Sequence, residues 1–315
     1  MQRMNQLEHL VEKNLWLAVT LSIVIGFTVP QVSVFYPYVK EMLMFIVFLT
    51  ALKLDFPEFK GVFASLPRVA AFYAAFFIVF PAVVFLIVRN LLPMEYALGL
   101  FVAFLMPAGV STPAYADFLK GKIELSLFIV ALTMFAAPFV VPAMLFLLTG
   151  KIASETLAPM FGMLATLLAL PVAAAIVVRK FACNAIEKTR SVYSLVSLVA
   201  IILLIASSLA VTADEARAKA FSLALPVAFV IALFGAALFL GYTFVSRDAR
   251  ERVSFGLAAY YRNYLAAIVF TGLFLGTEAM LFVTMLQIPL DLTTSVYALA
   301  LGKKQNAVQT AKNKK

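Results

Sequence analysis

The segment MPAGVSTPAYADF, residues 106–118, interrupts a long apolar run with two prolines, a glycine and small polar side chains. Pro107 and Pro113 each remove a hydrogen bond from a continuing helix. Ser111 or Thr112 followed by Pro113 is typical of a helix start, with an N-cap residue and proline at the first helical position. We therefore expect a broken helix whose second half begins inside the apolar run, where its free N–H groups favour an anion. A proline-kinked helix without a ligand is the alternative.

A second apolar run is interrupted near its middle by AAYYRNYLAA, residues 258–267, which contains Arg262 and Asn263. An arginine at bilayer depth costs at least about 2.5–3.5 kcal/mol, so it normally faces the protein interior and has a partner there. Its planar fork suits a carboxylate, sulfonate or phosphate on a substrate. An internal salt bridge with Asp291, in LQIPLDLTTS (286–295), is equally compatible with the pattern.

The composition of the whole chain decides the class of protein. Of 315 residues, 64% are hydrophobic and 13% are charged, against about 45–50% and about 25% in soluble domains, which excludes a soluble globule. A membrane-spanning helix needs about 20 apolar residues. The expected fold is an all-α membrane protein with ten transmembrane helices, at residues 15–30, 37–53, 67–90, 94–118, 123–149, 156–178, 191–212, 220–245, 253–275 and 279–302.

Basic residues are distributed unevenly between these spans. Of the 25 Lys and Arg residues, nineteen fall on one side of the expected membrane and five on the other, and the one that remains, Arg262, lies near the middle of a span. The positive-inside rule places both termini in the cytoplasm, and we expect a multipass protein of a bacterial inner membrane. The net charge of +9 indicates no nucleic acid partner, because it is not clustered on one water-facing patch. We expect the lipid bilayer as partner and a monomer or homodimer.

The supply of reactive side chains is small. One cysteine, Cys183, and one histidine, His9, leave too few groups for a zinc site, a thiol nucleophile or a histidine relay. No HExxH or GxSxG motif is present. We therefore expect no enzymatic activity, no metal site and no organic cofactor.

The ten expected spans divide into two halves of five, and the halves have opposite orientations because five is odd. This five-plus-five inverted repeat is typical of secondary transporters, whose substrate sites lie where interrupted helices meet. The two interrupted runs are the fourth and ninth spans, which hold corresponding positions in the two halves. We expect these two broken helices to cross.

Two stretches carry a family resemblance. FLTALKLDFPEF (48–59) and PAGVSTPAYADFLKGKIELSLFIVALTMFAAPFVVP (107–142) resemble the bile acid:sodium symporter family. The resemblance implies two domains, a core that grips the substrate and a panel against which it moves. The expected parts are an interfacial segment at 1–14, a panel at 15–60 and 156–212, a core at 67–149 and 220–302, and a basic cytoplasmic tail at 303–315.

Symporters of this family bind two sodium ions with residues of the fourth and ninth spans. The resemblance places Thr112 and Pro113 at the first of these positions, and Ala258, Arg262 and Asn263 at the second. No carboxylate remains among them. Because sodium needs several hard oxygen ligands, these replacements put sodium coupling in doubt.

Positions in neighbouring spans support the same interpretation. Ser126 matches a further sodium ligand, whereas Val130 stands where a hydroxyl is expected and Phe76 stands where relatives have a glutamine. Ser126, Thr133 and Asp291 remain the candidates for coupling to an ion or a proton. Transport energy would come from Na+, from H+ or from the substrate gradient alone.

The leading hypothesis is a secondary active transporter that moves a small or amphipathic organic anion by alternating access between core and panel. Its expected substrate-binding residues are Ser111, Thr112, Pro113, Arg262 and Asn263. The alternative is a membrane-embedded sensor or scaffold that retains the fold without transport. Arsenite is excluded as the substrate, because the related arsenite carriers use a cysteine in the fourth span and none is present here.

Overall fold

The structure, a computed structural model of the chain, describes residues 15–53, 65–150, 152–287 and 289–290. Apart from one isolated β-bridge, the regular elements in these ranges are helical. The first half contains α2 (Leu15–Thr28), η1 (Pro30–Tyr38), α3 (Val39–Lys53), α5 (Leu66–Tyr73), η2 (Ala74–Val79), α6 (Phe80–Val88), α7 (Met94–Leu105), α8 (Thr112–Phe118) and α9 (Ile123–Thr149).

The second half is also helical within the described ranges. It contains α10 (Ser154–Leu164), η3 (Ala165–Ala169), α11 (Leu170–Val211), α12 (Ala213–Phe244), α13 (Ala249–Tyr260), α14 (Tyr264–Phe274) and a further helix at 277–287. The element η1 is a 3-10 helix, whereas η2 and η3 are π-helical turns.

Six helices in the described part of the chain are long and apolar enough to cross a membrane, which makes this an all-helical, multipass membrane protein. They are Pro30–Leu52, Leu66–Val88, Ile123–Thr149, Ser154–Thr189, Val192–Val211 and Leu225–Phe244. Two shorter apolar helices, Met94–Leu105 and Tyr264–Phe274, belong to the interrupted spans. The expected segment 1–14, the tail 303–315, and the tenth span from Asp291 onward fall outside the described residues.

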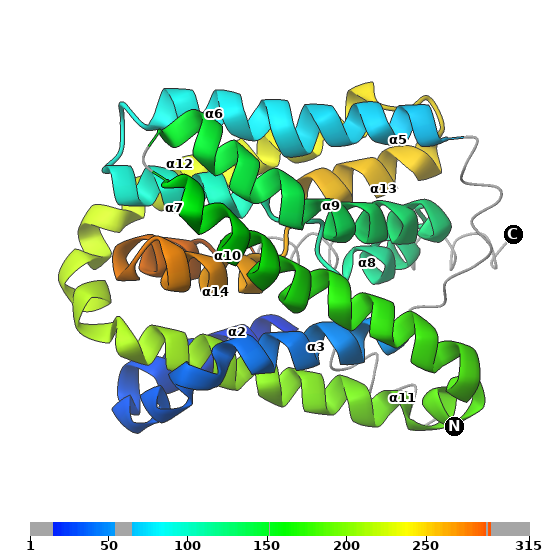
Figure 1. Ribbon diagram of the computed structural model, residues 1–315, viewed down its shortest axis with the longest axis horizontal. Coiled ribbons are helices and arrows are strands. Elements are labelled where there is room, and N and C mark those ends of the chain that lie inside the picture. The colour runs from blue at the N-terminus through cyan, green and yellow to red at the C-terminus, as the bar shows by residue number, and fades with distance from the viewer. Residues whose placement is uncertain (1–14, 54–64, 151, 288, 291–315) are drawn as a thin grey trace, which may run out of the picture.

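The helices are arranged in layers. Helices α2, α3 and α11 pack together and form the lower layer of Figure 1, while α5 and α6 lie along its upper edge. A Cβ atom at Gly26 of α2 would lie 2.9 Å from the carbonyl oxygen of Ala206 in α11, so a small residue is needed for this close approach. Helices α7 and α14 contact each other between the two layers.

The expected loop between the sixth and seventh spans, residues 179–190, is not a loop. The charged stretch between the expected sixth and seventh spans is helical, and α11 consists of two helices merged across a kink at Ala182 (φ −126°, ψ 22°). Arg179 in this stretch is buried and donates to Leu52 O at 2.7 Å and to Glu187 Oε1 at 2.9 Å. Because its charge is paired inside the fold, the segment does not need a solvated loop to accommodate it.

Both expected interruptions are present. The first lies between the end of α7 at Leu105 and the start of α8 at Thr112, and the second separates the end of α13 at Tyr260 from the start of α14 at Tyr264. The connecting backbone is extended, for example at Met106 (φ −61°, ψ 149°). Each interrupted span therefore consists of two short helices joined by non-helical residues.

Candidate functional site

The two interruptions pair with each other. Ala108 and Arg262 form an antiparallel β-bridge, flanked by hydrogen bonds from Gly109 N to Tyr261 O at 2.8 Å and from Asn263 N to Pro107 O at 2.9 Å. Backbone inside a membrane must satisfy its polar groups within the protein. Each broken helix therefore provides the hydrogen-bond partners that the other has lost, and the predicted crossing of the fourth and ninth spans has a direct structural basis.

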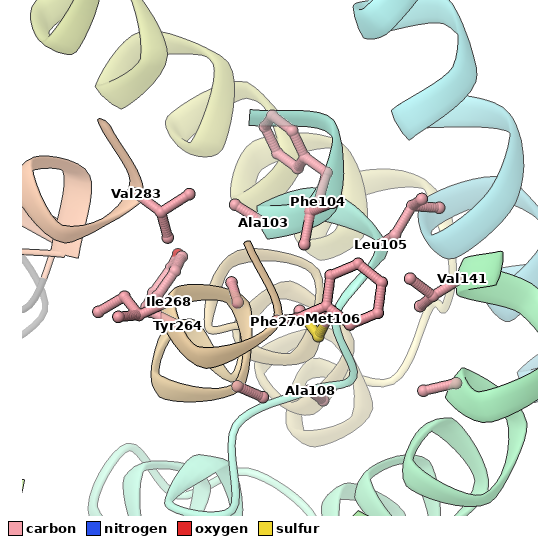
Figure 2. Close-up of a cluster of buried hydrophobic side chains, with 14 of the residues drawn as sticks. Ala103, Phe104, Leu105, Met106, Ala108, Val141, Tyr264, Ile268, Phe270 and Val283 are labelled. Atoms are coloured by element: carbon pink, nitrogen blue, oxygen red, sulfur yellow. The ribbon is translucent and has the colours of Figure 1, made fainter. Parts of the chain in front are cut away.

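Figure 2 follows the chain at this crossing from Phe104 and Leu105 of α7 through Met106 to Ala108, with Tyr264 of α14 among the surrounding side chains. Ala108, Met106 and Tyr264 are buried. The backbone of the crossing is thus enclosed by apolar side chains, which strengthen the hydrogen bonds within it because the local dielectric constant is low.

Thr133 ties the first interruption to α9. Its Oγ1 accepts a hydrogen bond from Ala108 N at 3.1 Å and donates to Val130 O at 3.0 Å. The side chain is 1% exposed. Thr133, expected from the sequence to couple ions or protons, thus satisfies a backbone N–H that the break would otherwise leave unpaired.

Gly109 permits the two chains to approach. A Cβ atom at this position would lie 2.3 Å from Cδ1 of Tyr261, which is closer than any real contact between such atoms. The Tyr261 ring also packs edge-on against Tyr115 of α8, with 5.2 Å between the ring centroids. Gly109 in the first interruption is therefore needed because any side chain there would overlap the Tyr261 ring in the second.

Arg262 is among the largest fully buried side chains of the described structure, with 1% of its surface exposed. Its Nη2 donates to the carbonyl oxygen of Phe76 at 2.8 Å, and its guanidinium lies 3.6 Å from the centre of the Phe77 ring. Nε and Nη1 have no hydrogen-bond partner among the described residues. A buried arginine with two donor nitrogens left unpartnered is expected to bind an anion or a carboxylate.

The carbonyl oxygen of Phe76 is available because of a π-turn. In η2 the N–H of Phe80 donates to Ala75 O, five residues back, and the next residue, Pro81, has no N–H to donate to Phe76. The same pattern occurs in η3, where Pro171 follows a π-turn. An aromatic run followed by proline was the sequence signal for this contact, and sequence reasoning missed it.

Asn263 begins α14. Its Oδ1 accepts a hydrogen bond from Ala266 N at 3.1 Å, which caps the helix. Its Nδ2 is buried and has no partner among the described residues. Asn263 and Arg262 therefore place three unsatisfied N–H-bearing nitrogen atoms on adjacent residues of one interruption.

The start of α8 differs in part from the expectation. The helix begins at Thr112, so Pro113 is its second residue rather than its first, and neither Ser111 nor Thr112 caps the helix with its side chain. Thr112 N donates instead to Gly109 O at 2.9 Å, so this N–H is not free for an anion. The reason is that the preceding residues turn back on themselves rather than entering the helix in an extended conformation.

Two hydroxyl groups near this point are buried without a partner in the described structure. They are Thr112 Oγ1 and Ser126 Oγ, and both side chains are fully buried. Asp291, the third candidate for coupling, falls outside the described residues. Within the described ranges no group of three or more His, Cys, Asp or Glu side chains could hold a metal ion.

Charged residues form one cluster away from the crossing. The carboxylate of Glu251, near the start of α13, pairs with Arg68 and Lys122 and accepts a hydrogen bond from Ser246 at 2.8 Å. Burial raises the pKa of Glu251, but the hydrogen bonds from Ser246 and Lys122 and the charge of Arg68 bring that pKa below its ordinary value. The cluster therefore joins the ends of α5, α9 and α13.

A separate pair of basic residues lies near the start of α12. Lys219 Nζ lies 2.6 Å from Glu278 Oε1. Arg217 donates to Phe27 O and lies 2.9 Å from Asp214. These contacts join the start of α12 to α2 and to the helix at 277–287.

Comparison with known proteins identifies a family for this chain. Residues 41–218 match the family model described as the Sodium Bile acid symporter family. The matched segment includes α7, the first interruption and α8, whereas Arg262 lies beyond it. A comparison with curated protein sequences found no match. Since the match covers more than half of the chain, this protein belongs to the sodium bile acid symporter family.

Proposed function

We propose that this protein is a secondary transporter that moves an amphipathic organic anion across the membrane by alternating access. The observation that carries the proposal is Arg262, a fully buried cation at the crossing of two interrupted helices, with Nε and Nη1 unpartnered in the described structure. A carboxylate or sulfonate has the charge and the acceptor oxygens that these N–H groups need. Substrate sites of secondary transporters lie at such interruptions.

The surroundings of Arg262 favour a substrate with an apolar body. The Phe77 ring covers one face of the guanidinium, and Phe77 itself packs against Phe72 and Tyr73. An anion bound at Arg262 would therefore have aromatic side chains beside its charged group. Apolar ligand surface gains free energy from such walls, whereas a small hydrated ion does not.

Arg262 also accounts for the proposed loss of sodium coupling. The resemblance to sodium symporters places a glutamine side chain at position 76, where this chain has phenylalanine. Here the Phe76 carbonyl oxygen accepts a hydrogen bond from the guanidinium. We infer that the fixed charge of Arg262 takes the place of a bound sodium ion. Transport would then use a proton, with Asp291 as the candidate carrier, or the substrate gradient alone.

The proposed architecture has ten spans in a five-plus-five inverted repeat, divided into a core and a panel. Helices α2, α3 and α11, which pack together, would form the panel. The two interrupted helices would belong to the core. This proposal also places both termini in the cytoplasm of a bacterial cell. The positive-inside rule assigns basic residues to the cytoplasmic side, and two of those residues, Arg68 and Lys122, meet in the cluster around Glu251.

Uptake into proteoliposomes tests the proposal. The purified full chain would be reconstituted, and uptake of radiolabelled taurocholate, a naphthalenesulfonate and toluenesulfonate would be measured. Sulfonates stay ionised and do not cross the bilayer as neutral acids. We expect uptake of at least one of them without sodium. A strict sodium requirement would contradict the replacement of sodium by Arg262, and saturable binding of these anions without any uptake would favour the sensor or scaffold.

A further inference from the structure

The unpaired charge of Arg262 distinguishes it from the other buried arginine in the described structure. Arg179 is 8% exposed and has Glu187 Oε1 at 2.9 Å as its counter-ion. Arg262 is 1% exposed, and within the described residues its contacts are an uncharged carbonyl and an aromatic face. Counted over the described residues, the crossing therefore carries a net positive charge in an enclosed, apolar environment.

A bound monovalent anion changes this balance. Its oxygen atoms would accept hydrogen bonds from Nε and Nη1, which have no described partner, and its charge would cancel that of the guanidinium. The occluded site then contains no net charge and fewer unsatisfied donors. Without the anion, the same occluded site retains a buried charge and two unpartnered donor nitrogens, both of which are unfavourable in a low dielectric.

This difference bears on how the carrier returns after releasing its substrate. Alternating access passes through an occluded state in which the site is closed to water on both sides. A carrier with its anion bound reaches this state with the charge neutralised. An empty carrier must dehydrate Arg262 to reach it, so its return is the slow step.

We propose that the protein is an anion exchanger, in which an anion carried inward must be matched by an anion carried outward. This proposal rests on the anion transport proposed above and specifies its stoichiometry: one monovalent organic anion for another, with no net charge moved. Obligatory exchange follows from a fixed charge that has no counter-ion among the described residues and that a bound substrate neutralises. In a sodium symporter, by contrast, the cation enters and leaves with the substrate.

Trans-stimulation measures this property directly. Proteoliposomes of the full chain would be prepared empty or loaded with unlabelled taurocholate, and the initial rate of labelled taurocholate uptake would be compared. We expect loaded vesicles to take up label about tenfold faster or more. Dehydrating an arginine raises the free-energy barrier enough to slow the return of the empty carrier by at least this factor. A potassium diffusion potential set with valinomycin should leave the exchange rate unchanged.

The outcomes separate this proposal from the transport function itself. Equal and measurable rates in loaded and empty vesicles would overturn exchange but leave anion transport standing. Uptake by loaded vesicles that accelerates with an inside-positive potential would also overturn electroneutral exchange. Absence of uptake for taurocholate, the naphthalenesulfonate and toluenesulfonate, with and without internal anion, would overturn both proposals.

Two variants test whether the charge of Arg262 is the cause. Arg262→Lys keeps the charge, so we expect residual uptake to remain dependent on internal anion, whereas any residual uptake by Arg262→Gln should show a loaded-to-empty ratio close to one. Arg179→Gln is the matched control, since it removes a buried arginine that has its own counter-ion; its ratio should equal that of the unmodified protein. The ratio is independent of how much folded protein each preparation contains. An unchanged ratio in Arg262→Gln would overturn the proposal.

Discussion

Nη2 of Arg262 donates a hydrogen bond of 2.8 Å to the carbonyl oxygen of Phe76, a residue 186 positions earlier in the chain. This contact joins the second interruption to the π-turn η2 and holds the guanidinium against the Phe77 ring. It leaves Nε and Nη1 without a hydrogen-bond partner among the described residues, and these are the groups proposed to bind the anion. The position of the cation is therefore set by a backbone irregularity in a different span.

The first prediction concerns the cation itself. Arg262→Gln should raise the KM for taurocholate about tenfold or more, because charge-assisted hydrogen bonds contribute about 1.5–3 kcal/mol. Concentration-dependent uptake into proteoliposomes measures this change. Arg179→Gln, which alters a buried arginine far from the crossing, should leave KM unchanged. Unaltered KM in Arg262→Gln would remove Arg262 from the binding site.

The second prediction concerns Pro81, which acts through Phe76 rather than on the substrate. Pro81→Ala supplies an N–H that competes with Arg262 for the Phe76 carbonyl oxygen. We expect KM to rise several-fold, with thermal stability in detergent unchanged or raised, because a mid-helix proline is removed.

Pro171→Ala is the matched control for Pro81→Ala, because Pro171 follows the other π-turn, η3, whereas the Arg262 guanidinium bonds to η2. It should give the same change in thermal stability with no change in KM. If both proline variants shift KM equally, the π-turn at η2 has no special role in positioning Arg262.

The third prediction tests the close approach at the crossing. Gly109→Ala should lower the free energy of unfolding by about 1–3 kcal/mol, because the added methyl group overlaps the Tyr261 ring. Thermal unfolding followed by intrinsic fluorescence in detergent measures the effect. Gly162→Ala provides the comparison: it has open space around the new Cβ and should be neutral or stabilising, since alanine favours a helix. Equal stability of the two variants would contradict the pairing of the interruptions.

The fourth prediction separates two roles for Thr133. If its hydroxyl serves mainly to pair Ala108 N, Thr133→Val should cost about 1–3 kcal/mol of stability, the penalty of an unsatisfied buried donor. Thr284→Val is the control, because Thr284 Oγ1 bonds only to the carbonyl of its own helix at Met280. A change in sodium or proton dependence without loss of stability would instead support the coupling role expected from the sequence.

The fifth prediction concerns acid stability. The pKa of Glu251 in the folded protein lies below its ordinary value of 4.5, so the unfolded chain binds a proton at higher pH than the folded one. The stabilisation from this group is present above pH 4.5 and is lost as pH falls through the folded pKa.

Thermal unfolding as a function of pH measures this contribution. Glu251→Gln should lower Tm at neutral pH and flatten its decline below about pH 5, where the unfolded carboxyl group begins to bind a proton. Glu155→Gln, at an exposed position of α10, should retain the pH profile of the unmodified protein. Identical profiles for the two variants would show that the cluster around Glu251 does not stabilise the fold.

Sequence reasoning was most successful where the cause was local. Proline and glycine cannot continue a helix without loss, so Pro107 and Pro113 marked the first interruption. A charge within an apolar run is costly, so Arg262 marked the second. It failed at the charged stretch around Arg179, where the charges suggested a solvated loop. The stretch is helical because Leu52 O and Glu187 provide hydrogen-bond partners for the Arg179 side chain within the fold.

The sequence by itself determined that this is a multipass helical membrane protein, interrupted at two points, with one arginine inside a span. Only the tertiary structure decided that Ala108 pairs with Arg262, that Thr133 satisfies the unwound backbone, and that Phe76 holds the guanidinium. The physical reason is that helix interruptions and buried charges arise from residues within a few positions of one another. Their partners, by contrast, are chosen by packing between segments up to 186 residues apart.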